Sequence, residues 1–142
     1  MINGLLLKVV LILAGLAIMA LGLNIGLGGI QTLGWQVSDP YLTVTNHALF
    51  TVQDNHIRFI GGLWFCIGAI FFLGAIFQTT LRATLIILCL AVGFAGLFRL
   101  SGADVLNAAI LPSLALELIA FPLLALWISR TGKTAPPSTV PV

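Results

Sequence analysis

Two arginines and one glutamate lie in or beside apolar runs that are otherwise almost free of charge. Side chains of these types could bind a ligand or carry a proton. Arg58, three residues after Asn55, begins one apolar run, Arg99 ends another, and Glu117 lies within a third. A carboxylate in such surroundings is costly unless it is protonated or paired, and it often carries a proton or contacts a ligand. Guanidinium groups bind carboxylates and phosphates through paired hydrogen bonds. Asn55, Arg58, Arg99 and Glu117 therefore form our candidate polar pocket.

Each of the three charges adjoins small residues three or four positions away. These are Gly61 and Gly62 beside Arg58, Gly96 beside Arg99, and Ala120 beside Glu117. Small residues mark the faces through which helices meet in lipid, so we expect the charges to converge on one outward-opening pocket. The same residues could instead form a buried network that fixes helix register without any chemistry. Spacing alone leaves both alternatives open.

The composition determines the class of protein. Hydrophobic residues make up 60% of the 142 positions and charged residues 7%, whereas about a quarter of a soluble domain is charged. The apolar runs approach the ~20 residues that cross a bilayer about 30 Å thick. We therefore predict an all-α polytopic membrane protein, a bundle of four transmembrane helices. The six basic residues are scattered singly, which excludes a nucleic-acid interface.

The runs predict one domain over residues 1–130, with helices at about residues 5–30, 57–80, 82–100 and 105–129. Residues 31–55 are more polar, and Pro40 disfavours helical geometry at Asp39. We expect this segment outside the membrane, as a strand or an interfacial helix, with Trp35 and Tyr41 at headgroup level. Residues 131–142 are expected to be a disordered cytoplasmic tail. Pro122 predicts a kink beside Glu117, because it removes a backbone donor.

Six glycines are assigned to helix packing: Gly22, Gly26, Gly61, Gly62, Gly68 and Gly96. The pair Gly22 and Gly26 forms a GxxxG, which allows two helix backbones to approach closely. Packing within the monomer and dimerisation both fit this motif. The lipid bilayer is the partner that the composition requires, and a membrane protein partner or a homo-oligomer is a further possibility.

Cofactors, metals and catalytic residues are not expected. Cys66 and Cys89 lie inside apolar runs without a Cys-x-x-Cys motif, so neither a disulfide framework nor a zinc site is indicated. His47, Asp54 and His56 match no metal-ligand spacing. The chain also has no glycine-rich phosphate loop, no HExxH and no nucleophile elbow.

The distribution of basic residues predicts the orientation. In a four-span arrangement, one side of the membrane receives Lys8, Arg82, Arg130 and Lys133, and the other receives Arg58 and Arg99. The side richer in lysine and arginine is cytoplasmic by the positive-inside rule. Both termini are therefore expected in the cytoplasm, and residues 31–55 on the outer side.

The pattern of sparse polar groups resembles that of a known family. The pattern combines an Asn-x-x-Arg-x-x-Gly-Gly helix start, an arginine before a short loop and a glutamate in the last helix. Here it consists of Asn55, Arg58, Gly61, Gly62, Arg99 and Glu117. It is similar to the bacterial membrane family called domain of unknown function 4345, over almost the whole chain apart from the proline-rich tail. The resemblance implies a four-helix protein of the bacterial inner membrane, and the family carries no established activity.

The leading hypothesis is a non-enzymatic accessory or scaffold protein with a buried arginine and glutamate cluster. The alternative is a small amphiphile- or lipid-binding or transport protein that uses an outward-facing pocket of Arg58, Arg99 and Glu117. A membrane enzyme ranks third, because so few polar groups are present for catalysis.

Overall fold

The computed structural model describes residues 2–32, 44–102, 107–108 and 110–131, and all of its regular elements are helical. Four helical segments are long and apolar enough to span a membrane: Gly4–Gly28, His47–Ile76, Gln78–Arg99 and Leu111–Thr131. The prediction of an all-α membrane protein with four spans is confirmed. Some sequence-based predictions lie outside the described residues, namely those for Trp35, Asp39, Pro40, Tyr41, Lys133 and the tail from residue 132.

The chain divides into two compact units. One unit comprises residues 8–76, and the other comprises residues 1–7 together with residues 77–142. The first contains most of α1 (Ile2–Gly28), the 3₁₀ turn η1 (Gly29–Thr32) and α2 (His47–Ile76). The second contains α3 (Gln78–Arg99), α4 (Leu111–Ala115), η2 (Leu116–Ala120) and α5 (Phe121–Thr131).

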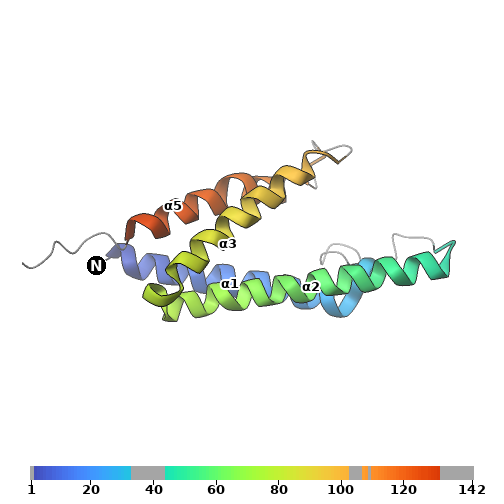
Figure 1. The fold of residues 1–142 in the computed structure, drawn as a ribbon, viewed down its shortest axis with the longest axis horizontal. Coiled ribbons are helices and arrows are strands. Elements are labelled where there is room, and N and C mark those ends of the chain that lie inside the picture. Colours follow the sequence, from blue (N-terminus) through green and yellow to red (C-terminus); the bar gives the residue numbers. More distant parts are fainter. Residues whose placement is uncertain (1, 33–43, 103–106, 109, 132–142) are drawn as a thin grey trace, which may run out of the picture. The chain divides into compact units, whose positions relative to one another are not determined.

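Helices α1 and α2 lie side by side (Figure 1) and touch through glycines. A Cβ added at Gly15 would lie 2.8 Å from the carbonyl oxygen of Gly68, and one at Gly22 would lie 2.8 Å from that of Gly61. Residue numbers rise on α1 as they fall on α2, so the helices are antiparallel. Glycine permits this backbone contact because it has no side chain to hold the helices apart.

Helix α2 begins at His47, ten residues before the predicted start at residue 57. Asn46 supplies the start signal, because its Oδ1 accepts a hydrogen bond from the backbone N–H of Leu49 at 3.0 Å. Asparagine is among the residues that best satisfy the free N–H groups of a first helical turn. Residues 47–55, predicted to belong to the extramembrane segment, are therefore a helical extension of this span.

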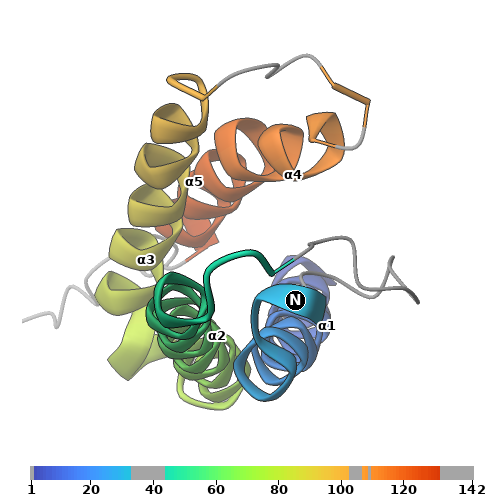
Figure 2. The same ribbon diagram turned by 90° about the vertical axis from the view of Figure 1, so that its right-hand side faces the viewer.

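Helix α3 packs against α5 in the second unit, and the two lie side by side in Figure 1. The buried side chains of α3 include Leu85, Cys89 and Val92, which are three or four residues apart on one face. Helix α5 contributes Ala125 and Ile128 at the same helical spacing. Figure 2 shows α4 leading through η2 into α5, so these three segments together make the fourth span.

The middle of this fourth span is a π-helical turn, η2. The N–H of Phe121 donates to the carbonyl oxygen of Leu116, five residues back, in place of the usual four. The next residue, Pro122, has no N–H, and in a regular helix its ring would clash with the carbonyl of Leu118. A π turn widens the helix at this point, and such turns are frequent at functional sites. Glu117 lies within it.

Candidate functional site

The central polar contact of the second unit is an ion pair between Arg99 and Glu117. Arg99 Nε lies 2.7 Å from Glu117 Oε2. The glutamate is only 6% exposed, whereas the arginine side chain is 46% exposed. Oε2 is held by charge attraction at short distance and lacks a well-aligned hydrogen bond within the part of the chain that the structure describes. The pair therefore offsets the cost of a buried carboxylate in a membrane segment.

Two glycines of α3 make room for the π turn and for the side chain of Glu117. A Cβ at Gly96 would lie 2.8 Å from Cβ of Glu117 and 3.3 Å from its Oε2. A Cβ at Gly93 would lie 3.1 Å from Cγ of Pro122 and 3.3 Å from the carbonyl oxygen of Glu117. The glycine face of α3 thus receives the π turn and the glutamate that projects from it. This contact places Glu117 within reach of Arg99, one turn further along α3.

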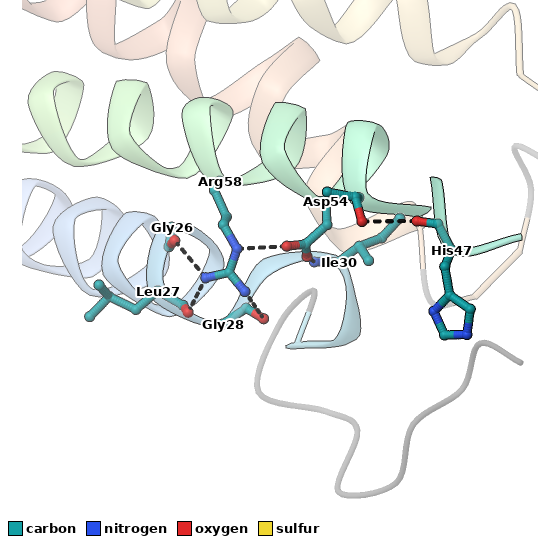
Figure 3. Close-up of polar contacts among 8 residues, drawn as sticks. Gly26, Leu27, Gly28, Ile30, His47, Asp54 and Arg58 are labelled. Carbon is teal, nitrogen blue, oxygen red and sulfur yellow. Dashed lines mark hydrogen bonds and ion pairs between the residues drawn. The ribbon is translucent and has the colours of Figure 1, made fainter. Parts of the chain in front are cut away.

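The first unit has its own polar group, which we call the Arg58 cluster: Asp54, Arg58 and the carbonyl groups of Gly26, Leu27 and Gly28. Arg58 Nε donates to Asp54 Oδ2 at 2.7 Å, as Figure 3 shows. Its Nη1 donates to the carbonyl oxygens of Leu27 and, at 3.4 Å, Gly26. Its Nη2 donates to that of Gly28 at 3.4 Å. The guanidinium therefore caps the C-terminal end of α1.

Helix physics explains this arrangement. The last carbonyls of a helix have no partner within it, and the dipole places partial negative charge there, so a cation is favoured. Gly29 ends α1 with φ +73°, in the left-handed region that glycine adopts at helix ends. The N–H of Ile30 then donates to Asp54 Oδ1 at 2.8 Å. Asp54 thus joins the arginine to the backbone after α1 (Figure 3).

A comparison with family models assigns the chain to a protein family. A model described as Domain of unknown function (DUF4345) matches residues 6–128. This chain belongs to the DUF4345 family. The match covers both polar groups, from Asp54 and Arg58 to Arg99 and Glu117. Comparisons of this DUF4345 chain with curated proteins and with solved structures give no significant match.

The four residues of the predicted pocket fall in both units of this DUF4345 protein. Arg99 and Glu117 are together in one unit, and Arg58 and Asn55 are in the other. Asn55 is exposed, and its side chain makes no hydrogen bond with the residues that the structure describes. A pocket shared by all four residues therefore stays a prediction.

The structure adds two polar contacts that the sequence-based site omitted. Asp54 is the partner of Arg58, and the spacing of four residues within one helix was an available signal for that pair. Arg82 Nη2 donates to the carbonyl oxygen of Ser129, near the end of α5. No local spacing connects these two residues, because their contact depends on how α3 and α5 pack.

Proposed function

We propose that this protein is a non-enzymatic accessory or scaffold protein of the bacterial inner membrane, with both termini in the cytoplasm. One observation carries the proposal: three arginines bind groups of the chain itself. Arg58 binds Asp54 and the end of α1, Arg82 binds the end of α5, and Arg99 pairs with Glu117. Charges used in this way support a structural role in each unit.

The helix faces support the same proposal. The GxxxG of α1 meets α2 of the same chain, because Gly22 faces Gly61 and Phe65, and Gly26 faces Gly61 and Gly62. These glycines therefore serve packing within the monomer. A membrane protein partner or a second copy would meet the exposed apolar side chains of the spans, which are abundant: Leu13 and Leu27 of α1 are 62% and 76% exposed.

The test compares the wild type with Glu117→Gln. Each protein is tagged in its own membrane, cross-linked there, extracted in mild detergent and weighed by native mass spectrometry. We expect the same stoichiometric protein partner on both forms, with Glu117→Gln less stable to heat. A small molecule that leaves a folded Glu117→Gln protein would contradict the accessory role. So would a wild-type chain that is monomeric and without a partner after cross-linking.

The alternative function is binding of an amphiphile by Arg58, Arg99 and Glu117. The half-exposed side chain of Arg99 supports it, because part of that guanidinium is open to a ligand. Arg58 supports it less, since its Nε and both Nη atoms already donate to Asp54 and to the end of α1. In the alternative, Arg58 would have to release these carbonyls before it could receive a ligand.

A further inference from the structure

We infer that Arg99 is the binding residue of a site for a phosphate anion, with Glu117 as the residue that positions it. In this site Glu117 holds Nε of the guanidinium, and the two Nη atoms bind the phosphate. The phosphate is either the headgroup of an anionic phospholipid or free in solution. This inference needs neither Arg58 nor a protein partner, so it stands apart from the accessory role.

Arg58 and Arg99 differ in how many of their N–H donors have partners. Arg58 uses its Nε and both Nη atoms on Asp54 and on carbonyls of α1. In Arg99 only Nε has a partner, Glu117, and neither Nη atom donates to an acceptor within residues 44–102, 107–108 or 110–131. Nearly half of the side chain is exposed. Arg99 therefore offers two adjacent donors, which is the geometry that binds a phosphate in bidentate fashion.

Glu117 holds the guanidinium of Arg99 in place. Its carboxylate is buried, in the space left by Gly96, and it lies 2.7 Å from Nε. A planar guanidinium held at Nε presents its Nη1–Nη2 edge in a limited range of directions. Fixing a side chain before a ligand arrives reduces the conformational entropy lost on binding. The buried carboxylate thus orients the guanidinium of Arg99 before a phosphate binds. Its negative charge also weakens the attraction between Arg99 and an anion.

Arg99 lies at one end of a helix long enough to span the membrane. Helix α3 has 22 residues, which span about 33 Å at 1.5 Å per residue, close to the ~30 Å hydrocarbon thickness. Arg99 is its last residue, so the guanidinium lies where lipid phosphates begin. The preceding turn is apolar and exposed, with Phe94 63%, Leu97 51% and Phe98 66% accessible. These side chains can contact the acyl chains of a lipid whose phosphate is bound to Arg99.

The experiment measures retained lipid on the full chain. The wild type, in nanodiscs of phosphatidylcholine mixed with phosphatidylglycerol, is released into detergent and weighed by native mass spectrometry. We expect one retained phosphatidylglycerol and no retained phosphatidylcholine. Arg99→Gln should reduce this retention about tenfold, the loss of roughly 1.4 kcal/mol. Arg99→Lys keeps the positive charge and loses the paired Nη donors of the guanidinium. This variant should reduce phosphatidylglycerol retention by a few fold, less than Arg99→Gln does.

Two further variants separate this site from general charge attraction. Arg130→Gln removes one exposed positive charge near the end of α5 and should leave retention unchanged. Glu117→Gln removes the negative charge beside Arg99 and keeps an amide oxygen that can hold Nε, so the folded protein should retain more phosphatidylglycerol than the wild type, whereas a pair without a role in binding predicts unchanged retention. Circular dichroism verifies the fold of every variant, and Arg99→Lys serves as the test if Arg99→Gln does not fold.

Competition with inorganic phosphate identifies the source of the anion. Displacement of phosphatidylglycerol at millimolar phosphate would support the site and assign it to a soluble phosphate. Resistance to phosphate would support the site and assign it to a lipid. Equal retention of phosphatidylglycerol and phosphatidylcholine would overturn the inference, and so would a folded Arg99→Gln or Arg99→Lys protein that retains phosphatidylglycerol as the wild type does.

Discussion

The two units hold their helices together in different ways. Helices α1 and α2 meet backbone to backbone: a Cβ at Gly22 would lie 2.4 Å from the backbone nitrogen of Phe65, and one at Gly61 would lie 2.2 Å from that of Gly26. Helix α3 meets the fourth span mainly through side chains of that span. There Gly93 faces the ring of Pro122, and Gly96 faces the side chain of Glu117.

This difference explains where each unit places its charges. Backbone contact between α1 and α2 leaves little room for a polar side chain, and Arg58 and Asp54 lie beyond it, at the end of α1. The side-chain contact in the second unit leaves room for a buried carboxylate and for the π turn that carries it. Arginine closes a helix end in both units, through Arg58 and Arg82.

The largest effect is expected for Gly61→Leu. Its side chain would have to occupy the space of the α1 backbone at Gly26, and overpacking of this kind costs about 2 kcal/mol or more. The measurement is the free energy of unfolding in detergent micelles or bicelles, by steric trapping.

The neighbouring glycine provides the matched control for this substitution. A Cβ at Gly62 meets nothing within 4 Å, so Gly62→Leu should change stability by less than about 0.5 kcal/mol. Equal losses for the two variants would contradict backbone contact between α1 and α2 at Gly61.

A smaller effect is expected for Gly29→Ala at the end of α1. Its φ of +73° is unfavourable for alanine, and the new Cβ would lie 2.0 Å from Asp54 Oδ1. The aspartate could move away only by giving up its contacts with Ile30 and Arg58. We expect a loss of about 1–3 kcal/mol in the free energy of unfolding. Gly62→Ala, whose new Cβ would meet nothing within 4 Å, should be nearly neutral in the same assay.

The smallest effect is expected for Asp54→Asn. The amide oxygen can still accept from the N–H of Ile30, whereas the charge attraction to Arg58 is lost. Because the Arg58 side chain is 43% exposed, water and salt screen the pair, and exposed pairs contribute little. The stability difference from the wild type should shrink as the salt concentration rises. A difference that does not change with salt would contradict an electrostatic origin.

Much of the fold could be predicted because membrane spans follow from composition and length. Four uncharged or nearly uncharged runs predicted four spans, and the structure has four helical segments long and apolar enough to span a membrane. The start of α2 could not be predicted in the same way. Residues 47–55 are polar enough to suggest a loop, and their helix depends on the capping of Leu49 by Asn46 together with contacts to the end of α1.

The candidate site could be predicted in part for a related reason. Glu117 could be predicted as a site residue because a carboxylate in an apolar run needs a partner. Arg99 is that partner in the structure. The partners of Arg58 are mainly backbone carbonyls, which every residue carries, so no residue type signals them. The pairing of Arg82 with Ser129 likewise depends on helix packing. Sequence spacing indicates which charges need partners, and tertiary packing decides which groups they receive.

The most direct test of a structural role for the buried charge is a double-mutant cycle between Arg99 and Glu117. The free energy of unfolding is measured for the wild type, Arg99→Gln, Glu117→Gln and the double variant in the same bicelles. With Arg99 half exposed, we expect a coupling energy of about 1 kcal/mol or somewhat more. The double variant should then be clearly more stable than the sum of the two single losses implies. Strictly additive losses would show that the pair does not stabilise the second unit, and would contradict the structural role proposed for it.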